Sequence, residues 1–225
     1  MSPIKSFILN YLRPFGKQSF LSSLQQNAKI LDLGCGNTSV IGIKAVLPNC
    51  SYVGIDVLDY NQTDLSRSLM DRYLISKPDE FATIIKSQEN DFDAVISCHN
   101  LEHCNDMEET LLAMIKVTKI NGKIYLSFPS KQTVSYPSRK GTLNYFDDDT
   151  HQAKPPNFEK VVSMLEHNGC EITFAVEKYR PLILRMFGFI MEPFSAILKK
   201  NLIGTWELYG FETVIHAKKL KEASK

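Results

Sequence analysis

The chain has 225 residues, of which 44% are hydrophobic, and its formal net charge is +1. This length and hydrophobic content suit one α/β domain with a large core. A net charge this close to zero provides no general basic field, so nucleic-acid binding is disfavoured. We expect a single domain over residues 1–225.

The five cysteines are scattered and odd in number, without a Cys-x-x-Cys pair. This usage is typical of reduced thiols and predicts no disulfide framework. The sequence after Met1 lacks the long apolar core and cleavage site of a signal peptide. These features together predict a cytoplasmic protein.

Apolar residues at helical spacing between positions 4 and 26 predict two short helices, with a break at Pro14 and Gly16. Residues 1–28 are therefore expected to form a helical extension ahead of the first strand. No chemistry is assigned to this extension.

A glycine turn follows the first apolar run, Ile30-Leu31-Asp32-Leu33-Gly34-Cys35-Gly36. This pattern predicts a buried parallel strand that ends where a ligand meets bare backbone, because glycine permits positive φ and close approach. A second apolar strand, Tyr52–Asp56, ends in a carboxylate about 20 residues after the glycines, the spacing of a ribose-binding acid. We expect Asp56 to bind a ribose.

The first of these runs resembles the hydrophobic-hydrophobic-Asp-hydrophobic-Gly-x-Gly motif of class I S-adenosylmethionine (SAM)-dependent methyltransferases, including the type 11-like small-molecule enzymes. Phe92–Ser97 and Gly122–Pro129 resemble the fourth and fifth strands of that family. The resemblance spans residues 30–217 and implies a Rossmann-like, doubly wound α/β sheet. Its seven strands would have the order 3-2-1-4-5-7-6, with the last strand antiparallel and helices on both faces.

The resemblance also implies SAM as the cofactor. The residues that would hold it, through side chains or backbone, are Asp32, Gly34, Cys35, Gly36, Asp56, Cys98 and His99. The family's usual third glycine near Thr38 is missing, although Thr38 or Ser39 can cap a helix that runs to Leu47. Ser39 also replaces the last glycine of a dinucleotide motif, which disfavours an NAD-dependent dehydrogenase.

A third strand is predicted at Arg72–Ser76, followed by a helix from Pro78. In the resembling family an acid after this strand often contacts the adenine amino group. Asp79 could have this role, or it could simply favour the start of the helix.

The segment after the fourth strand, Ser97–Cys104, has the densest chemistry in the chain. Its Leu-Glu-His run resembles a box of small-molecule methyltransferases that is often structural, with the acid capping the next helix, Met107–Thr118. Alternatively, a helical turn would place His99, Glu102 and His103 on one face as metal ligands.

That second interpretation resembles the Glu-x-x-Glu-His metal box of ubiquinone-pathway O-methyltransferases and small-RNA 2′-O-methyltransferases. The RNA enzymes add a later histidine, which His151 could supply. His99 stands where those families have Glu, which would favour Mn²⁺, Fe²⁺ or Zn²⁺ over Mg²⁺.

Residues 130–151 form a long segment without periodicity, which usually indicates a functional loop. Its aromatic and charged residues suit a hydroxylated acceptor. His151 is the first candidate for the general base and His103 the second, because imidazole titrates near neutral pH. The alternative is that His151 has a structural role and caps or packs beside Pro155 and Pro156.

A capped amphipathic helix is predicted at 157–168 and a strand at Glu171–Lys178. Residues 179–205 form an apolar helical insertion, interrupted by Pro181 and Pro193. We expect a helical pair that lies on a partner subunit in a homodimer, on a membrane surface or on a lipid-linked acceptor, or else a core helix. Trp206–Ala217 is expected to be the last strand.

The combined prediction is O-methylation of a hydroxylated small molecule or sugar, such as a surface-glycan precursor. RNA 2′-O-methylation is an alternative. A non-catalytic methyltransferase-like binding or assembly subunit is another, and a dehydrogenase ranks third.

Overall fold

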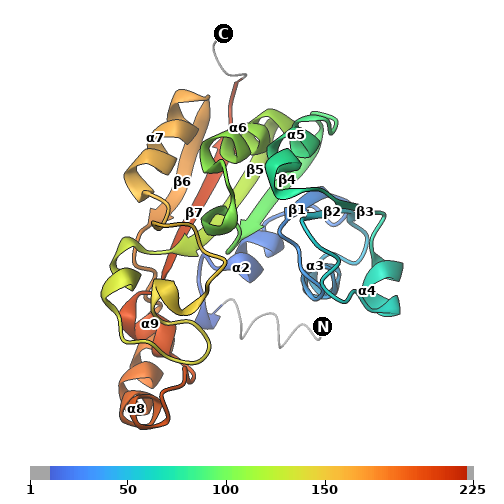
Figure 1. Cartoon of the computed structure of the whole chain (residues 1–225). Coiled ribbons are helices and arrows are strands. Elements are labelled where there is room, and N and C mark those ends of the chain that lie inside the picture. The colour runs from blue at the N-terminus through green and yellow to red at the C-terminus, as the bar shows by residue number, and fades with distance from the viewer. Residues whose placement is uncertain (1–10, 222–225) are drawn as a thin grey trace.

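Seven strands form one sheet in a computed structural model that describes residues 11–221 (Figure 1). The strands are β1 Lys29–Leu33, β2 Ser51–Asp56, β3 Arg72–Ile75, β4 Phe92–Cys98, β5 Thr118–Pro129, β6 Cys170–Val176 and β7 Glu212–Lys219. Their order is β3-β2-β1-β4-β5-β7-β6, and β7 is antiparallel to both of its neighbours. The predicted topology is confirmed.

Helices cover both faces of the sheet, with α5, α6 and α7 on one face and α2 and α3 on the other (Figure 1). The helices are α2 Lys17–Ser22, α3 Ser39–Val46, α4 Asp64–Leu69, α5 Phe81–Lys86, α6 Met107–Val117, α7 Phe158–His167, α8 Leu182–Leu198 and α9 Thr205–Tyr209. Short 3₁₀ turns occur at Pro78–Glu80, Leu101–His103, Lys131–Ser135 and Tyr145–Asp147.

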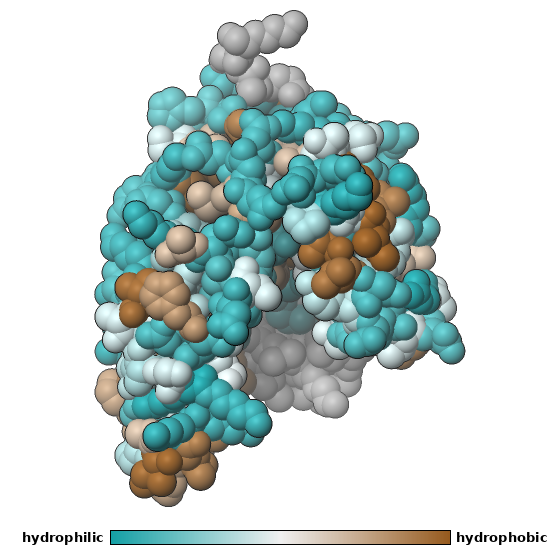
Figure 2. All heavy atoms as spheres, in the orientation of Figure 1, coloured by the Kyte–Doolittle hydropathy of each residue, from teal (hydrophilic) through white to brown (hydrophobic). Residues whose placement is uncertain are grey.

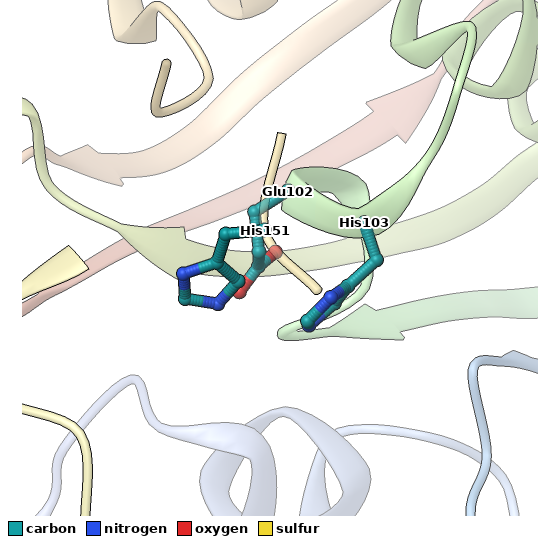
Figure 3. Close-up of side chains that lie close together, drawn as sticks. All are labelled: Glu102, His103 and His151. Atoms are coloured by element: carbon teal, nitrogen blue, oxygen red, sulfur yellow. The ribbon is translucent and has the colours of Figure 1, made fainter. Parts of the chain in front are cut away.

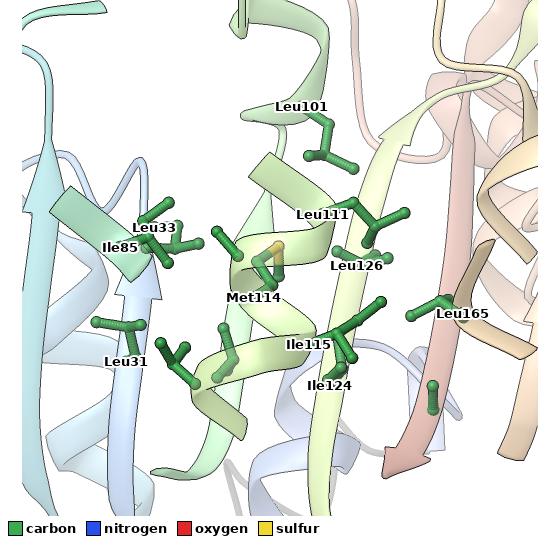
Figure 4. Close-up of a cluster of buried hydrophobic side chains, with 14 of the residues drawn as sticks. Leu31, Leu33, Ile85, Leu101, Leu111, Met114, Ile115, Ile124, Leu126 and Leu165 are labelled. Carbon is green, nitrogen blue, oxygen red and sulfur yellow. The ribbon is translucent and has the colours of Figure 1, made fainter. Parts of the chain in front are cut away.

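Successive side chains of each strand point to opposite faces of the sheet, so the fold has two apolar cores. Leu31 and Leu33 of β1 point to the core beneath α5, α6 and α7, whereas Ile30 points to the core beneath α2 and α3. Both faces of β1 are therefore buried, as its continuous apolar sequence predicts for a parallel strand. Figure 4 shows the first core, with Met114 and Ile115 of α6 lying against the sheet.

Several local predictions need correction. The first of the two N-terminal helices falls mostly on residues 1–10, outside the described residues. Thr38 occupies the capping position of α3, but its side chain makes no capping hydrogen bond. Helix α4 was not predicted, because its polar residues have little apolar periodicity.

The apolar insertion contains one long helix rather than a proline-separated pair, because α8 continues through Pro193. Trp206 begins no strand. It lies in α9, which is bounded by Gly204 at φ 81° and Gly210 at φ 73°, and β7 starts only at Glu212. Among the described residues, no helix has the length and apolar character needed to cross a membrane.

Candidate active site

The glycine turn lies at the carboxyl end of β1. Gly34 has φ +62°, and a Cβ atom there would lie 2.4 Å from Asn100 Oδ1, so only glycine fits. Gly36 has φ +51° with open space beside it. The turn therefore has the positive-φ backbone that the sequence predicts, and its contact with a ligand stays a prediction.

Asp56 lies at the end of β2 beside this turn and is 3% exposed. One carboxylate oxygen accepts a hydrogen bond from the Gly36 amide at 2.8 Å, and the other accepts one from the Val57 amide at 2.8 Å. Burial raises the pKa of Asp56, and the backbone hydrogen bonds partly oppose this shift. The carboxylate is thus oriented next to the glycine loop.

Asp32 has a different environment from the one expected for a cofactor ligand. Its carboxylate is 1% exposed and accepts hydrogen bonds from Ser39 Oγ and from Tyr52 Oη at 2.8 Å, with Lys17 Nζ 3.8 Å away. Cys35 is also buried, 4% exposed. Both side chains support the loop from beneath.

A cavity of about 370 Å³ opens at the ends of β4 and β5. Cys98 and His99 line it, whereas Gly34, Gly36 and Asp56 lie outside its lining. The residues that sequence reasoning missed are Arg13, Lys17, Ser127, Trp206 and Glu212. No local motif marks them, because they come from three separate parts of the chain.

His99 is held between two carboxylates. It has φ +48°, and its Nδ1 and Nε2 atoms lie 3.2 Å from Glu102 Oε1 and 3.2 Å from Glu212 Oε1. Burial alone lowers the pKa of His99, but its hydrogen bonds to the two carboxylates raise it to about 10. His99 is therefore an imidazolium whose two N–H groups both donate.

The pKa of Glu212, the second carboxylate beside His99, shifts in the opposite direction. Burial alone raises the pKa of Glu212, but His99 and Arg13 lower it to about 2. This charge network fixes one wall of the cavity. Both ring nitrogens of His99 face carboxylates in this network, so the predicted role of His99 as a metal ligand would require these contacts to break.

Glu102, His103 and His151 converge nearby (Figure 3). One potential ligand atom from each lies within 4.8 Å of the others. Glu102 is 1% exposed, and its Oε2 atom has no hydrogen-bond partner among the described residues. A buried carboxylate oxygen without a partner is costly and fits a site that receives a proton or a cation.

The hydrogen bonds of the two histidines set their tautomers. His151 Nδ1 lies 2.6 Å from the carbonyl oxygen of Tyr145, which can only accept, so this nitrogen carries the hydrogen. His103 Nδ1 lies 2.9 Å from Thr150 Oγ1, which donates its own proton to Asp148. In the neutral form of each imidazole the lone pair is therefore on Nε2.

The segment 130–151 is more ordered than the sequence predicts. Tyr145 is fully buried and donates a hydrogen bond to the carbonyl of Lys154, and Tyr136 donates one to Tyr209. The aromatic residues of this segment, Tyr136, Tyr145 and Phe146, were expected to stack on an acceptor. Tyr136 and Tyr145 instead hold the segment in place. Phe146 is 61% exposed and remains available.

Asp79 accepts a hydrogen bond from Asn105 Nδ2 at 2.6 Å, in the first turn of the 3₁₀ helix Pro78–Glu80. This position beyond β3 is compatible with either role considered for it. Its contact with adenine stays a prediction.

The glycine loop, the acid after β2 and the strand order together define a Rossmann-like methyltransferase fold. The family model described as "Methyltransferase domain" matches residues 9–174, well over half of the chain. The chain therefore belongs to this family of methyltransferase domains.

Curated relatives include the mitochondrial ubiquinone biosynthesis O-methyltransferase of Bos taurus, which is 27% identical over 178 residues. The alignment covers 75% of this chain and 45% of the relative, so the chain spans about half of the relative's length.

Solved structures show the same fold. One is the complex between the Haloferax volcanii Trm112 methyltransferase activator and a methyltransferase, with a TM-score of 0.63, 11% identity, and coverage of 97% of this chain and 95% of that one. Another is a SAM-dependent methyltransferase of Archaeoglobus fulgidus, with a TM-score of 0.53, 18% identity, and coverage of 96% and 93%.

Proposed function

We propose that the chain transfers the methyl group of SAM to a hydroxyl oxygen of a small molecule or sugar. The observation that carries this proposal is the lone pair on His151 Nε2, which the Nδ1 contact with the Tyr145 carbonyl leaves available as a base. An O-methyltransferase among the curated relatives supports the same reaction type.

The reaction balances without an additional reactant. SAM supplies an electrophilic methyl group, so the acceptor oxygen gains an O–CH₃ bond as the S–CH₃ bond breaks and S-adenosylhomocysteine (SAH) leaves. His151 Nε2 takes the proton of the acceptor hydroxyl, and His103 Nε2 is the second candidate. The remaining contribution of the protein is to hold the two reactants in line.

For the cofactor, the proposed contacts are Asp56 with the ribose hydroxyls and the backbone of Gly34 and Gly36 with the methionine portion. The backbone near Cys98 and His99 would line the other side of the site. Asp32 and Cys35 would act from beneath by shaping the loop, since their side chains are buried.

A panel of acceptors tests the proposed reaction. We expect SAH formation with hydroxylated aromatic compounds or sugars and none with matched amines. Short RNA oligonucleotides form a separate arm, because the RNA alternative predicts turnover there and binding that weakens steeply with salt. Turnover only with amines would contradict O-methylation, and SAH binding without any turnover would favour the non-catalytic subunit.

As an alternative role for the same Nε2 lone pairs, we propose that Glu102, His103 and His151 hold a divalent metal. Two imidazole nitrogens and one carboxylate oxygen form a donor set suited to Mn²⁺, Fe²⁺ or Zn²⁺. The unpartnered Glu102 Oε2 atom supports this assignment. A cation there would supply Lewis acidity to an acceptor oxygen.

Calorimetric titration with Mn²⁺ tests the metal site without needing an acceptor. We expect wild type to bind Mn²⁺ and His103→Ala to bind at least ~10-fold more weakly, because one of three ligands is lost. His167→Ala is the matched control, since His167 lies exposed on α7. Equal affinities in wild type and His103→Ala, or full turnover in excess chelator, would rule the metal out.

A further inference from the structure

Helix α8 presents its apolar face to solvent. The outward side chains Leu182, Met186, Phe189, Ile190, Phe194 and Ile197 are 57–80% exposed. Their spacing follows one side of a helix, and we call this side the outer face of α8. Figure 2 shows apolar atoms gathered at the end of the molecule that α8 forms in Figure 1.

The buried side of α8 carries Leu184 together with the small residues Gly188 and Ser195. A Cβ atom on Gly188 would lie 2.2 Å from the carbonyl oxygen of Gly204, so the helix backbone packs directly on the turn before α9. Arg139 donates hydrogen bonds to both carboxylate oxygens of Glu192, at 2.8 and 2.6 Å, and one to Ser195 Oγ at 2.6 Å. These contacts fix the rotation of α8, so its apolar side cannot turn inward.

Basic residues stand at both ends of the outer face. The segment 178–200 contains Lys178, Arg180, Arg185, Lys199 and Lys200. Its one acid, Glu192, is paired with Arg139, whereas the whole chain holds 26 basic and 25 acidic residues. The positive charge is therefore concentrated around an apolar face.

We propose that the outer face of α8 docks on an anionic lipid bilayer. Apolar side chains of an interfacial helix enter the boundary between headgroups and acyl chains, while basic side chains remain among anionic headgroups. A second copy of the chain fits the charges less well, because a two-fold contact would bring the same basic ends close to each other.

A second cavity, of about 350 Å³, is lined by Leu184 from the buried side of α8 and by Ile203, which is 59% exposed. Arg13 and Trp206 line both this cavity and the one at the ends of β4 and β5. Docking would therefore bring lipid close to a route toward the methyl-transfer site. This step rests on the proposed function, whereas membrane docking itself does not.

Vesicle sedimentation tests the docking without SAM or an acceptor. The full chain should sediment with vesicles of 70% phosphatidylcholine and 30% phosphatidylserine, and at least ~10-fold more weakly with phosphatidylcholine alone. The double variant Phe189→Ser/Phe194→Ser should lose at least ~10-fold in affinity for the anionic vesicles. Lys199→Glu/Lys200→Glu should also bind more weakly, and 0.5 M salt should remove most of that difference.

Ile120→Ser is the matched control, since Ile120 is 40% exposed at the start of β5 and should not affect sedimentation. Thermal unfolding of each variant confirms that it folds. Wild type that stays in solution with both vesicle types would overturn the proposal. So would unchanged binding of the Phe189→Ser/Phe194→Ser variant, or a wild-type dimer that this variant converts to a monomer.

Discussion

Replacement of Asp56 by alanine is expected to weaken SAH binding by at least about 100-fold. In the proposed site the carboxylate accepts hydrogen bonds from both ribose hydroxyls. A hydrogen bond to a charged group is worth roughly 1.5–3 kcal/mol, so losing two costs about 3–6 kcal/mol, and each 1.4 kcal/mol is tenfold in affinity. The variant also releases the amides of Gly36 and Val57, which shape the loop.

Calorimetric titration with SAH measures this effect directly and requires no acceptor. Asp59→Ala is the matched control, because Asp59 lies three residues further on, is exposed and pairs with Arg67 at 2.5 Å. Its dissociation constant should stay within about twofold of wild type. If Asp56→Ala binds SAH as tightly as wild type does, Asp56 does not hold the ribose.

The strands of the sheet could be predicted because each is marked by residues that are close together in the sequence. Each of the strands β1, β2 and β4 is a short run of apolar residues that ends at a polar or glycine position, and the resemblance gives their order. Gly34 is required by a turn and a close contact, both of which follow directly from the motif. The positions of the glycine turn and of Asp56 were therefore predictable from the motif, whereas their contacts with the cofactor stay predictions.

The charge network around His99 could not be predicted this way. His99 and Glu212 are 113 positions apart, and the antiparallel return of β7 brings them together. Spacing alone suggested a shared face for His99, Glu102 and His103, which requires helical geometry from position 99 onward. His99 instead adopts a positive φ, and the 3₁₀ turn starts at Leu101.

Helix α8 illustrates a different limit. Its periodicity reveals an apolar side, and the usual assumption is that such a side faces the core. Here the Arg139–Glu192 ion pair and the Gly188–Gly204 contact hold the opposite side inward. Similarly, Trp206-Glu207-Leu208-Tyr209 has the composition of a strand, and the positive-φ glycines on either side place it in α9.

The second large effect concerns the proposed base. His151→Asn should lower kcat by about 100-fold or more, the range that a general base contributes. Asparagine can still donate a hydrogen bond to the Tyr145 carbonyl from the place of Nδ1, but it lacks an equivalent of Nε2. SAH affinity should stay within about twofold of wild type, because His151 lies outside the predicted cofactor contacts. His167→Asn is the control and should retain full activity.

Two further measurements on His151→Asn separate a base from a metal ligand. A base must be deprotonated to act, so kcat/KM of wild type should rise with pH on the acidic side, and the variant should lose that rise. If His151 is a metal ligand, the variant should lose both Mn²⁺ affinity and turnover. If the variant keeps its Mn²⁺ affinity but loses the rise of kcat/KM with pH, His151 acts in proton transfer alone. Unchanged turnover of the variant would remove both roles.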